Sequence, residues 1–223
     1  MDPRQIIAAV RAAGRHVLLE DEAKSVLSHM GLPVNLCALA ASEEEAVAAA
    51  ETLGYPVAVK VRSPAVIHKS DAGGVWLGLG HAEAVRRAYR EMAARWGQVA
   101  VTVQPMAAPG VEVIAGVAQD PQFGPVAMFG LGGIFTEVLR DVAFRMIPLE
   151  PKDARAMITQ IRGYRLLAGY RGRRGVDLTA LEEILLGLSE LVEKIPDVRE
   201  VDLNPIIAYP DGALIVDARI TIA

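Results

Sequence analysis

The stretch Pro56-Val-Ala-Val-Lys60-Val-Arg62-Ser-Pro-Ala-Val-Ile-His68-Lys-Ser70-Asp-Ala-Gly73-Gly74-Val75 carries the most information about this chain. It begins with a short apolar run that encloses Lys60. Alternation along a strand turns this lysine to one face and its valine neighbours to the other. Burying a lysine is costly unless an anion pairs with it, and two adjacent glycines let backbone N–H groups approach a ligand closely. The stretch therefore indicates a phosphate site with a nucleophilic histidine, His68, beside it.

A plainer interpretation of the same residues stays open. A lysine on a strand is often solvent-facing on a half-exposed sheet, and Ser70-Asp71-Ala72-Gly73 is also ordinary hairpin chemistry. The order Gly-x4-Gly-Lys-Ser/Thr that defines a Walker loop is absent. Any phosphate site here is therefore of another kind.

Composition limits the class of protein. The chain has 223 residues, enough for one large domain or two small ones, and its 52% hydrophobic content indicates a folded globular protein. No apolar run reaches the roughly 18 residues of a membrane span, and the N-terminus lacks a signal-peptide pattern. Cys37 is the single cysteine, so no internal disulfide forms. We therefore expect a cytoplasmic protein.

The charge balance argues against a nucleic-acid partner. The net charge is −4, from 23 Lys and Arg against 27 Asp and Glu, whereas a general nucleic-acid binder shows a basic face. An anionic ligand must then be held by a local positive cluster. Lys60, Arg62, His68 and Lys69 form the best candidate.

The apolar patterns alternate between helical and extended periods. They predict helices over residues 20–30, 42–53, 81–96, 151–161 and 177–195. They predict strands over residues 57–61, 75–79, 99–104, 111–117, 126–129, 201–207 and 214–220. The last two strands are joined by a turn at residues 210–212. This mixture predicts an α+β or α/β layout with mixed sheets and no regular βαβ series.

A second candidate site lies near the C-terminal end of the chain. Asp202 and Asn204 share one face of a predicted strand, and the hairpin that follows brings Asp217 opposite them. Oxygen-bearing side chains together with nucleotide phosphates suit magnesium, which takes few protein ligands and keeps waters. An exposed polar strand face is the alternative.

Taken in order, these motifs resemble the ATP-grasp fold and, more narrowly, the β subunit of ADP-forming acyl-CoA synthetases, relatives of succinyl-CoA synthetase. The resemblance runs from about Leu19 to Ile222 and is most specific at residues 59–75, 130–137 and 201–205. It implies an α+β fold of two subdomains with mixed or antiparallel sheets flanked by helices. The smaller subdomain is expected over residues 21–104, and the larger over residues 1–20 plus 105–223.

The resemblance also implies a role at each matching position. The expected nucleotide-binding residues are Lys60, Arg62, Ser70, Gly73, Gly74, Gln104, Pro105, Met106 and Glu112. Among them the lysine grips the phosphates, the glycine loop covers them, residues 104–106 form a hinge whose backbone meets the adenine, and the glutamate faces the ribose. Asn204 and Asp217 match magnesium ligands. Asp202 matches an acid near an incoming phosphohistidine, and His68 matches a second phosphoryl carrier.

The implied activity is that of the nucleotide-binding subunit of an acid–thiol ligase, in which acid, CoA and ATP give acyl-CoA, ADP and phosphate. The cofactor is Mg²⁺, ATP or ADP is a substrate, and CoA binds to the partner. That partner is an α subunit with CoA-binding and ligase domains, which do not fit in 223 residues, and an α2β2 or similar assembly is expected. Two alternatives stay open: a regulatory ATP-grasp module without turnover, and a ligase joining a carboxylate to an amine. The residues around His68 argue against the second, because a direct acyl-phosphate route needs no histidine carrier.

Overall fold

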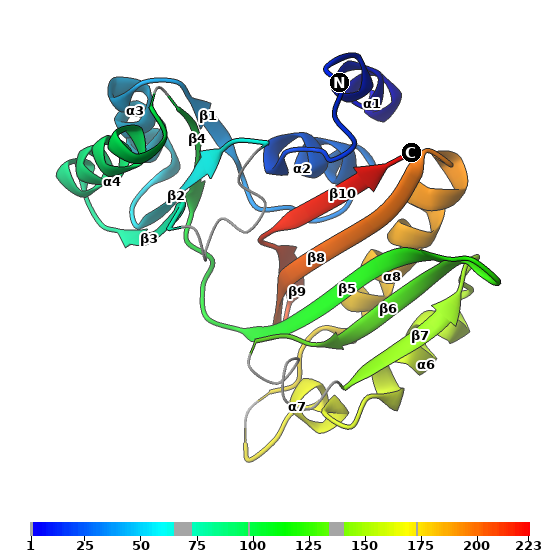
Figure 1. Cartoon of the computed structure of the whole chain (residues 1–223). Helices are drawn as coiled ribbons and strands as arrows, with labels where there is room; N and C mark the ends of the chain where they lie inside the picture. Colours follow the sequence, from blue (N-terminus) through cyan, green and yellow to red (C-terminus); the bar gives the residue numbers. More distant parts are fainter. Residues whose placement is uncertain (1, 65–72, 98, 134–140, 173) are drawn as a thin grey trace. The chain divides into compact units, whose positions relative to one another are not determined.

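The computed structural model describes residues 2–64, 73–97, 99–133, 141–172 and 174–223, which form two compact units (Figure 1). Unit 1 comprises Met1–Leu18, Glu22–Val34 and Pro109–Ala223, and unit 2 comprises Leu19–Asp21 and Asn35–Ala108. The helices are α1 (Pro3–Ala12), α2 (Glu20–His29), α3 (Glu43–Leu53), α4 (Ala82–Trp96), α6 (Pro151–Gln160), α7 (Tyr164–Ala168) and α8 (Leu178–Lys194). The strands are β1 (Ala38–Ala40), β2 (Val57–Arg62), β3 (Val75–Leu79), β4 (Ala100–Pro105), β5 (Val111–Asp120), β6 (Gly124–Leu131), β7 (Val142–Met146), β8 (Val198–Tyr209), β9 (Gly212–Ile215) and β10 (Ala218–Ile222).

Unit 2 is an antiparallel sheet in the order β1-β4-β2-β3, packed against α3 and α4 (Figure 1). Because side chains alternate along a strand, Val59, Val61 and Val103 point into the core with the helices. Helix α3 is capped at its N-terminus by Ser42, whose hydroxyl accepts the Glu45 N–H, and at its C-terminus by Gly54. The opposite sheet face is left for polar side chains.

Unit 1 is an antiparallel sheet in the order β10-β8-β5-β6-β7, with β9 also paired to β8. Helices α6 and α8 pack on one face of it. Helix α8 buries Leu181, Leu185 and Leu188, a spacing that makes one continuous apolar stripe. The opposite face therefore displays the alternate strand residues.

The architecture is the predicted α+β fold with antiparallel sheets flanked by helices. The predicted strand over residues 214–220 is in fact two strands, because β9 pairs with the end of β8 and β10 with its beginning. Residues 22–34 pack within unit 1, whereas the sequence places them in the smaller subdomain. In the part of the chain that the structure describes, no helix has both the length and the apolarity that crossing a membrane requires.

Candidate functional site

Lys60 lies on the polar face of the unit 2 sheet and is buried. Its exposure is only 4%, so the solvent-facing alternative is wrong. The ammonium Nζ is 2.6 Å from Oε1 of Glu20, which is also buried. The anion that a buried lysine requires is thus supplied by the first residue of α2.

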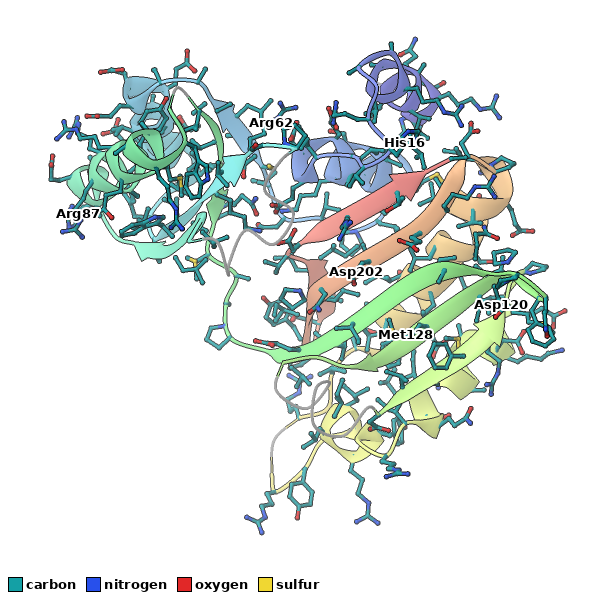
Figure 2. The ribbon with its side chains drawn as sticks, in the orientation of Figure 1. His16, Arg62, Arg87, Asp120, Met128 and Asp202 are labelled. Carbon is teal, nitrogen blue, oxygen red and sulfur yellow. The ribbon has the colours of Figure 1, made fainter. Side chains whose placement is uncertain are left out.

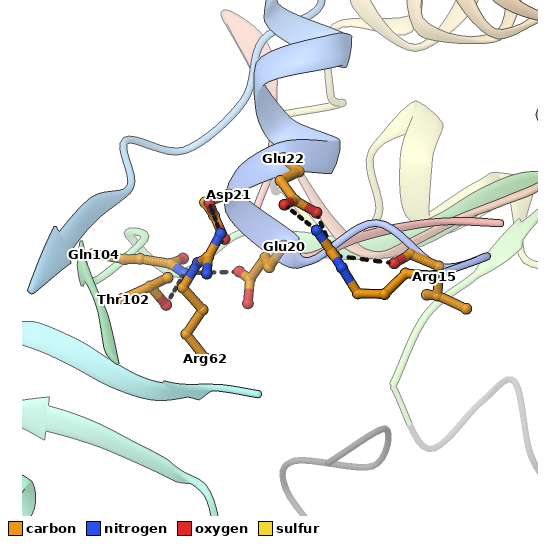
Figure 3. A network of polar contacts seen from close by, with 8 residues as sticks. Arg15, Glu20, Asp21, Glu22, Arg62, Thr102 and Gln104 are labelled. Atoms are coloured by element: carbon orange, nitrogen blue, oxygen red, sulfur yellow. Dashed lines mark hydrogen bonds and ion pairs between the residues drawn. The ribbon is translucent and has the colours of Figure 1, made fainter. Parts of the chain in front are cut away.

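A short chain of hydrogen bonds continues from this carboxylate. The side-chain amide of Gln104 donates to the same Glu20 oxygen at 2.7 Å and to the Thr102 hydroxyl at 3.2 Å (Figure 3). Register explains the grouping, because Thr102 on β4 faces Lys60 on β2, and Gln104 faces Ala58. Four side chains from two strands and one helix are therefore joined.

Arg62, two residues further along β2, has its own carboxylate partner. Its Nε and Nη2 donate to the two oxygens of Asp21 at 2.8 and 3.0 Å (Figure 3). This fork-to-fork geometry fixes the guanidinium plane. Both cations predicted to bind nucleotide are thus held by consecutive acids of α2.

The glycine pair lies next to the lysine. Val75 pairs with Lys60, and the Gly74 carbonyl accepts the Val61 N–H at 2.8 Å. Gly73 has φ 70°, and a Cβ built there would lie 2.7 Å from Nη1 of Arg95. The structure therefore brings Gly73 and Gly74 beside the cationic strand. The other two predicted residues of this loop, His68 and Ser70, lie outside the described residues.

The predicted hinge, residues 104–106, already makes hydrogen bonds within unit 2. The Met106 N–H donates to the Pro56 carbonyl at 3.0 Å, and the Pro105 carbonyl accepts the Asn35 side-chain amide at 3.0 Å. A carbonyl oxygen has two lone pairs, so Pro105 keeps the capacity to accept another donor. The Met106 side chain is 36% exposed.

The acidic residues gather on the open face of the unit 1 sheet. Asp202 and Asn204 are both exposed on one face of β8, where Figure 2 labels Asp202. Ala218 pairs with Leu203, so the preceding residue, Asp217, comes next to Asn204, as the hairpin predicts. The Ala218 N–H donates to Asp217 Oδ1 at 2.9 Å.

The electrostatics of this group are those of crowded carboxylates. Although Asp202 stays accessible to water, the protein atoms around its carboxylate raise its pKa. The charge of Asp217 raises that pKa further, and Arg219 opposes the shift. A site at which a neighbouring carboxylate disfavours the charge of Asp202 is suited to a cation.

Glu112 on β5 is separate from these acids and lies beside Gly132 and Gly133. Its carbonyl accepts the Gly132 N–H at 2.8 Å, and a Cβ at Gly133 would lie 2.9 Å from its Oε2. Gly116 on the same strand has a packing reason to be glycine. A Cβ there would meet the Val201 carbonyl oxygen at 2.5 Å.

The oxygen ligands that Asn204 and Asp217 offer suit magnesium, but they do not form a site in which protein side chains fill the whole coordination shell. Among the described residues, no group of three or more His, Cys, Asp or Glu side chains is arranged to hold a metal ion. Magnesium instead takes one or two carboxylates and completes its shell with waters and substrate phosphates. Asp217 and Asn204 match that limited demand.

Glu20 and Asp21 are the residues that the sequence reasoning missed. The acids at residues 20–22 indicate a helix start, because negative charge is favoured there. The signal that a buried lysine needs an anion was present, but nothing in the spacing identifies which acid meets it across 40 residues.

Comparison with known proteins gives one consistent result. The model of the ATP-grasp domain family matches residues 9–222. The chain is 45% identical over 226 residues to "Acetate--CoA ligase [ADP-forming] I subunit beta" of Pyrococcus furiosus, covering 97% of this chain and 96% of the relative. It is 44% identical over 206 residues to "Acetate--CoA ligase [ADP-forming] II" of Archaeoglobus fulgidus, where the match covers only 30% of a longer protein.

Solved structures agree with this assignment. The dinucleotide-forming acetyl-coenzyme A synthetase 1 of Ca. Korarchaeum cryptofilum, in complex with coenzyme A, Ca-AMPCP and HgCl+, aligns over 100% of both chains with a TM-score of 0.94 and 44% identity. A second structure of that protein, with coenzyme A and Mg-AMPPCP, aligns with a TM-score of 0.90. The chain therefore belongs to the ATP-grasp family and, within it, to the group formed by the β subunits of ADP-forming acetate–CoA ligases.

Proposed function

We propose that this chain is the nucleotide-binding subunit of an ADP-forming acyl-CoA synthetase, an acid–thiol ligase. The enzyme converts acid, CoA and ATP to acyl-CoA, ADP and phosphate. This subunit transfers the phosphoryl group between a phosphohistidine and ADP. The acid substrate binds to the partner.

The main support for the proposal is that the chain aligns with β subunits of ADP-forming acetate–CoA ligases over nearly their full length. A relative with 48% identity over 229 residues, acetate–CoA ligase [ADP-forming] II subunit beta of Pyrococcus furiosus, is covered over 96% of its own length. The match therefore extends over nearly the whole of both sequences. The related Korarchaeum structure with Mg-AMPPCP has its phosphohistidine segment pointing towards the nucleotide-binding site.

The polar face of unit 2 supports the phosphate role. Lys60 and Arg62 place two cations on one strand face, and the backbone of Gly73 and Gly74 leads into the neighbouring strand β3. Phosphoryl transfer depends mainly on positioning and on neutralising charge. These residues bind the phosphates, and residues 104–106 bind the adenine.

The acidic face of unit 1 supports the other half of the proposal. Asn204 and Asp217 would hold magnesium, Glu112 faces the ribose, and Asp202 receives the phosphohistidine. When bound, Mg²⁺ neutralises phosphate charge and orients the transferred group. The raised pKa of Asp202 favours its meeting an imidazole N–H, because a more basic carboxylate accepts hydrogen bonds more strongly.

His68 is proposed as a relay for the phosphoryl group. An imidazole is a competent nucleophile near pH 7 because its ordinary pKa is about 6.5. Replacing His68 by alanine in the complete enzyme should abolish turnover from ATP. Turnover equal to that of the wild type would remove His68 from the mechanism.

The partner is proposed to be an α subunit with CoA-binding and ligase domains, in an α2β2 or similar assembly. Relatives whose matching segment is about 30% of a longer ligase support the need for further domains. The single cysteine fits a reducing compartment, and we place the enzyme in the cytoplasm.

The test compares two lysines that differ in burial. Lys60→Met should weaken binding of Mg–ADP by the full chain at least about tenfold, because a charge-assisted phosphate contact contributes about 1.5–3 kcal/mol. Isothermal titration calorimetry measures this loss. Lys152→Met is the matched control, because Lys152 is an exposed lysine on α6. Equal affinity of Lys60→Met and wild type would exclude Lys60 as a phosphate ligand.

A further inference from the structure

Between residues that the structure describes, the acids of the first turn of α2 form three ion pairs that differ in burial. The pair of Arg15 with Glu22 has side-chain exposures of 21% and 17%, and that of Arg62 with Asp21 has 26% and 13%. The pair of Lys60 with Glu20 has only 5% and 1%. Water screens the first two, whereas the third is an ion pair in a low-dielectric environment.

We propose that Glu20 is a positioning residue for the nucleotide phosphates, acting through Lys60, and this inference rests on the proposed function. The carboxylate holds the ammonium at one place on the sheet face and supplies the countercharge that lets it stay buried. An ammonium has three N–H donors, so it can bind Glu20 and a phosphate oxygen together.

The support for Glu20 comes from the neighbouring strand. Gln104 donates to the same Oε1 that accepts from Lys60, and its amide is itself anchored on the Thr102 hydroxyl. One carboxylate oxygen therefore receives two donors from two different strands. The side chain of Gln104 thus orients Glu20, and Glu20 in turn orients Lys60. The backbone of Gln104 belongs to the predicted adenine hinge.

Removal of the charge at Glu20 changes the position of Lys60. Losing the carboxylate charge 2.6 Å from the ammonium makes burial of this cation less favourable, so we expect the lysine side chain to turn toward water. The adenine hinge would keep its backbone geometry. The expected loss is therefore confined to ligands that carry phosphate.

The test uses the full chain and two ligands, Mg–ADP and adenosine. Glu20→Gln should weaken Mg–ADP binding about tenfold or more, the size typical of lost outer-shell support, and leave the adenosine affinity unchanged. Calorimetry measures the first affinity and ligand-observed NMR the second. Glu22→Gln removes the Arg15 partner on the same helix turn, and should alter neither affinity.

A double variant tests whether Glu20 acts through Lys60. Adding Glu20→Gln to Lys60→Met should weaken Mg–ADP binding no further than Lys60→Met does alone. Additive losses, or an equal loss for adenosine, would show a merely structural role and overturn the inference. If Glu20→Gln does not fold, Glu20→Asp keeps the charge but retracts the oxygens, and should show the same phosphate-specific loss. A wild-type chain that binds no Mg–ADP overturns the proposed function, whereas a Glu20 variant that binds as the wild type does overturns only this inference.

Discussion

At the scale of single residues, the decisive fact is that Lys60 is buried against Glu20. A buried ion pair is a weak source of stability, but an unpaired buried charge is strongly destabilising. The pair is therefore better explained by the requirement for a cation at this position than by folding. Asp21 and Arg62 repeat the arrangement in a more exposed setting.

This difference predicts an asymmetric effect on stability. Lys60→Met alone should lower the free energy of unfolding by about 3–5 kcal/mol, because it removes the cation that lies 2.6 Å from the buried Glu20 carboxylate. Adding Glu20→Gln removes that charge and should recover much of the loss. Urea denaturation of both variants measures the difference. A double variant as unstable as Lys60→Met alone would contradict this explanation.

Gly73 carries a second prediction. Its φ of 70° disfavours any side chain, and a Cβ would meet the Arg95 guanidinium at 2.7 Å. Gly73→Ala should cost about 1 kcal/mol of stability and weaken Mg–ADP binding by displacing the glycine pair. Gly80→Ala is the control, because a Cβ at Gly80 meets nothing within 4 Å. Thermal unfolding and calorimetry should separate the two variants, and equal behaviour would contradict the prediction.

The pKa of Asp202 yields a prediction with a definite sign. Burial raises it most, followed by Asp217, whereas Arg219 lowers it. Asp217→Asn should therefore move the Asp202 titration to lower pH, and Arg219→Gln should move it higher. NMR of the side-chain carboxyl carbon, with EDTA present, measures both shifts. Movement in the opposite direction in either variant would contradict the assigned causes.

The same shift links Asp202 to stability. Because the pKa is raised in the folded state, the native protein binds more protons than the unfolded chain between the ordinary value near 3.8 and the raised one. Stability is thus lost as the pH rises through that window. Asp202→Asn should therefore raise stability at pH values above the raised pKa of Asp202. It should change stability little at pH values below the ordinary pKa.

At the scale of elements, alternating patterns predicted most strands that position the site. The run from Val57 to Val61 has valines on one face and the lysine on the other, and the structure has this arrangement. The hairpin of β8 with β9 and β10 was predicted by its turn at residues 210–212. Its break into two strands was not, because residues 216 and 217 continue the apolar and polar alternation of a single strand.

The elements that were missed are short or depend on distant partners. Strand β1 has three residues, too few for any period, and is defined only by its pairing with β4. Strand β7 exposes Phe144 and Met146, so its apolar residues do not mark one buried face in the sequence. The pairing of Glu20 with Lys60 was unpredictable for the same reason, since it joins a helix to a strand far along the chain.

At the scale of the whole molecule, the described residues form two hydrophobic cores, and each of these is made of residues from one unit. The larger core includes Val113 of β5, and the smaller includes Val103 of β4. Two subdomains were predicted, with residues 22–34 in the smaller one. These residues instead belong to the larger unit, because their apolar side chains pack in its core. Helix α2 is therefore divided, with Glu20 and Asp21 in unit 2 and the remainder in unit 1.

Separate cores predict that a cavity in one unit destabilises mainly that unit. Val103→Ala and Val113→Ala are matched, because both valines are fully buried at 0% exposure in strands. Each should cost about 2 kcal/mol, the loss of two methyl groups plus a cavity. Native-state hydrogen exchange should then accelerate in β2 and β4 for Val103→Ala and in β5 and β8 for Val113→Ala. Equal acceleration in both units for either variant would mean that the chain opens as a single cooperative unit, and the proposed nucleotide-binding face of unit 2 would then lack a stability of its own.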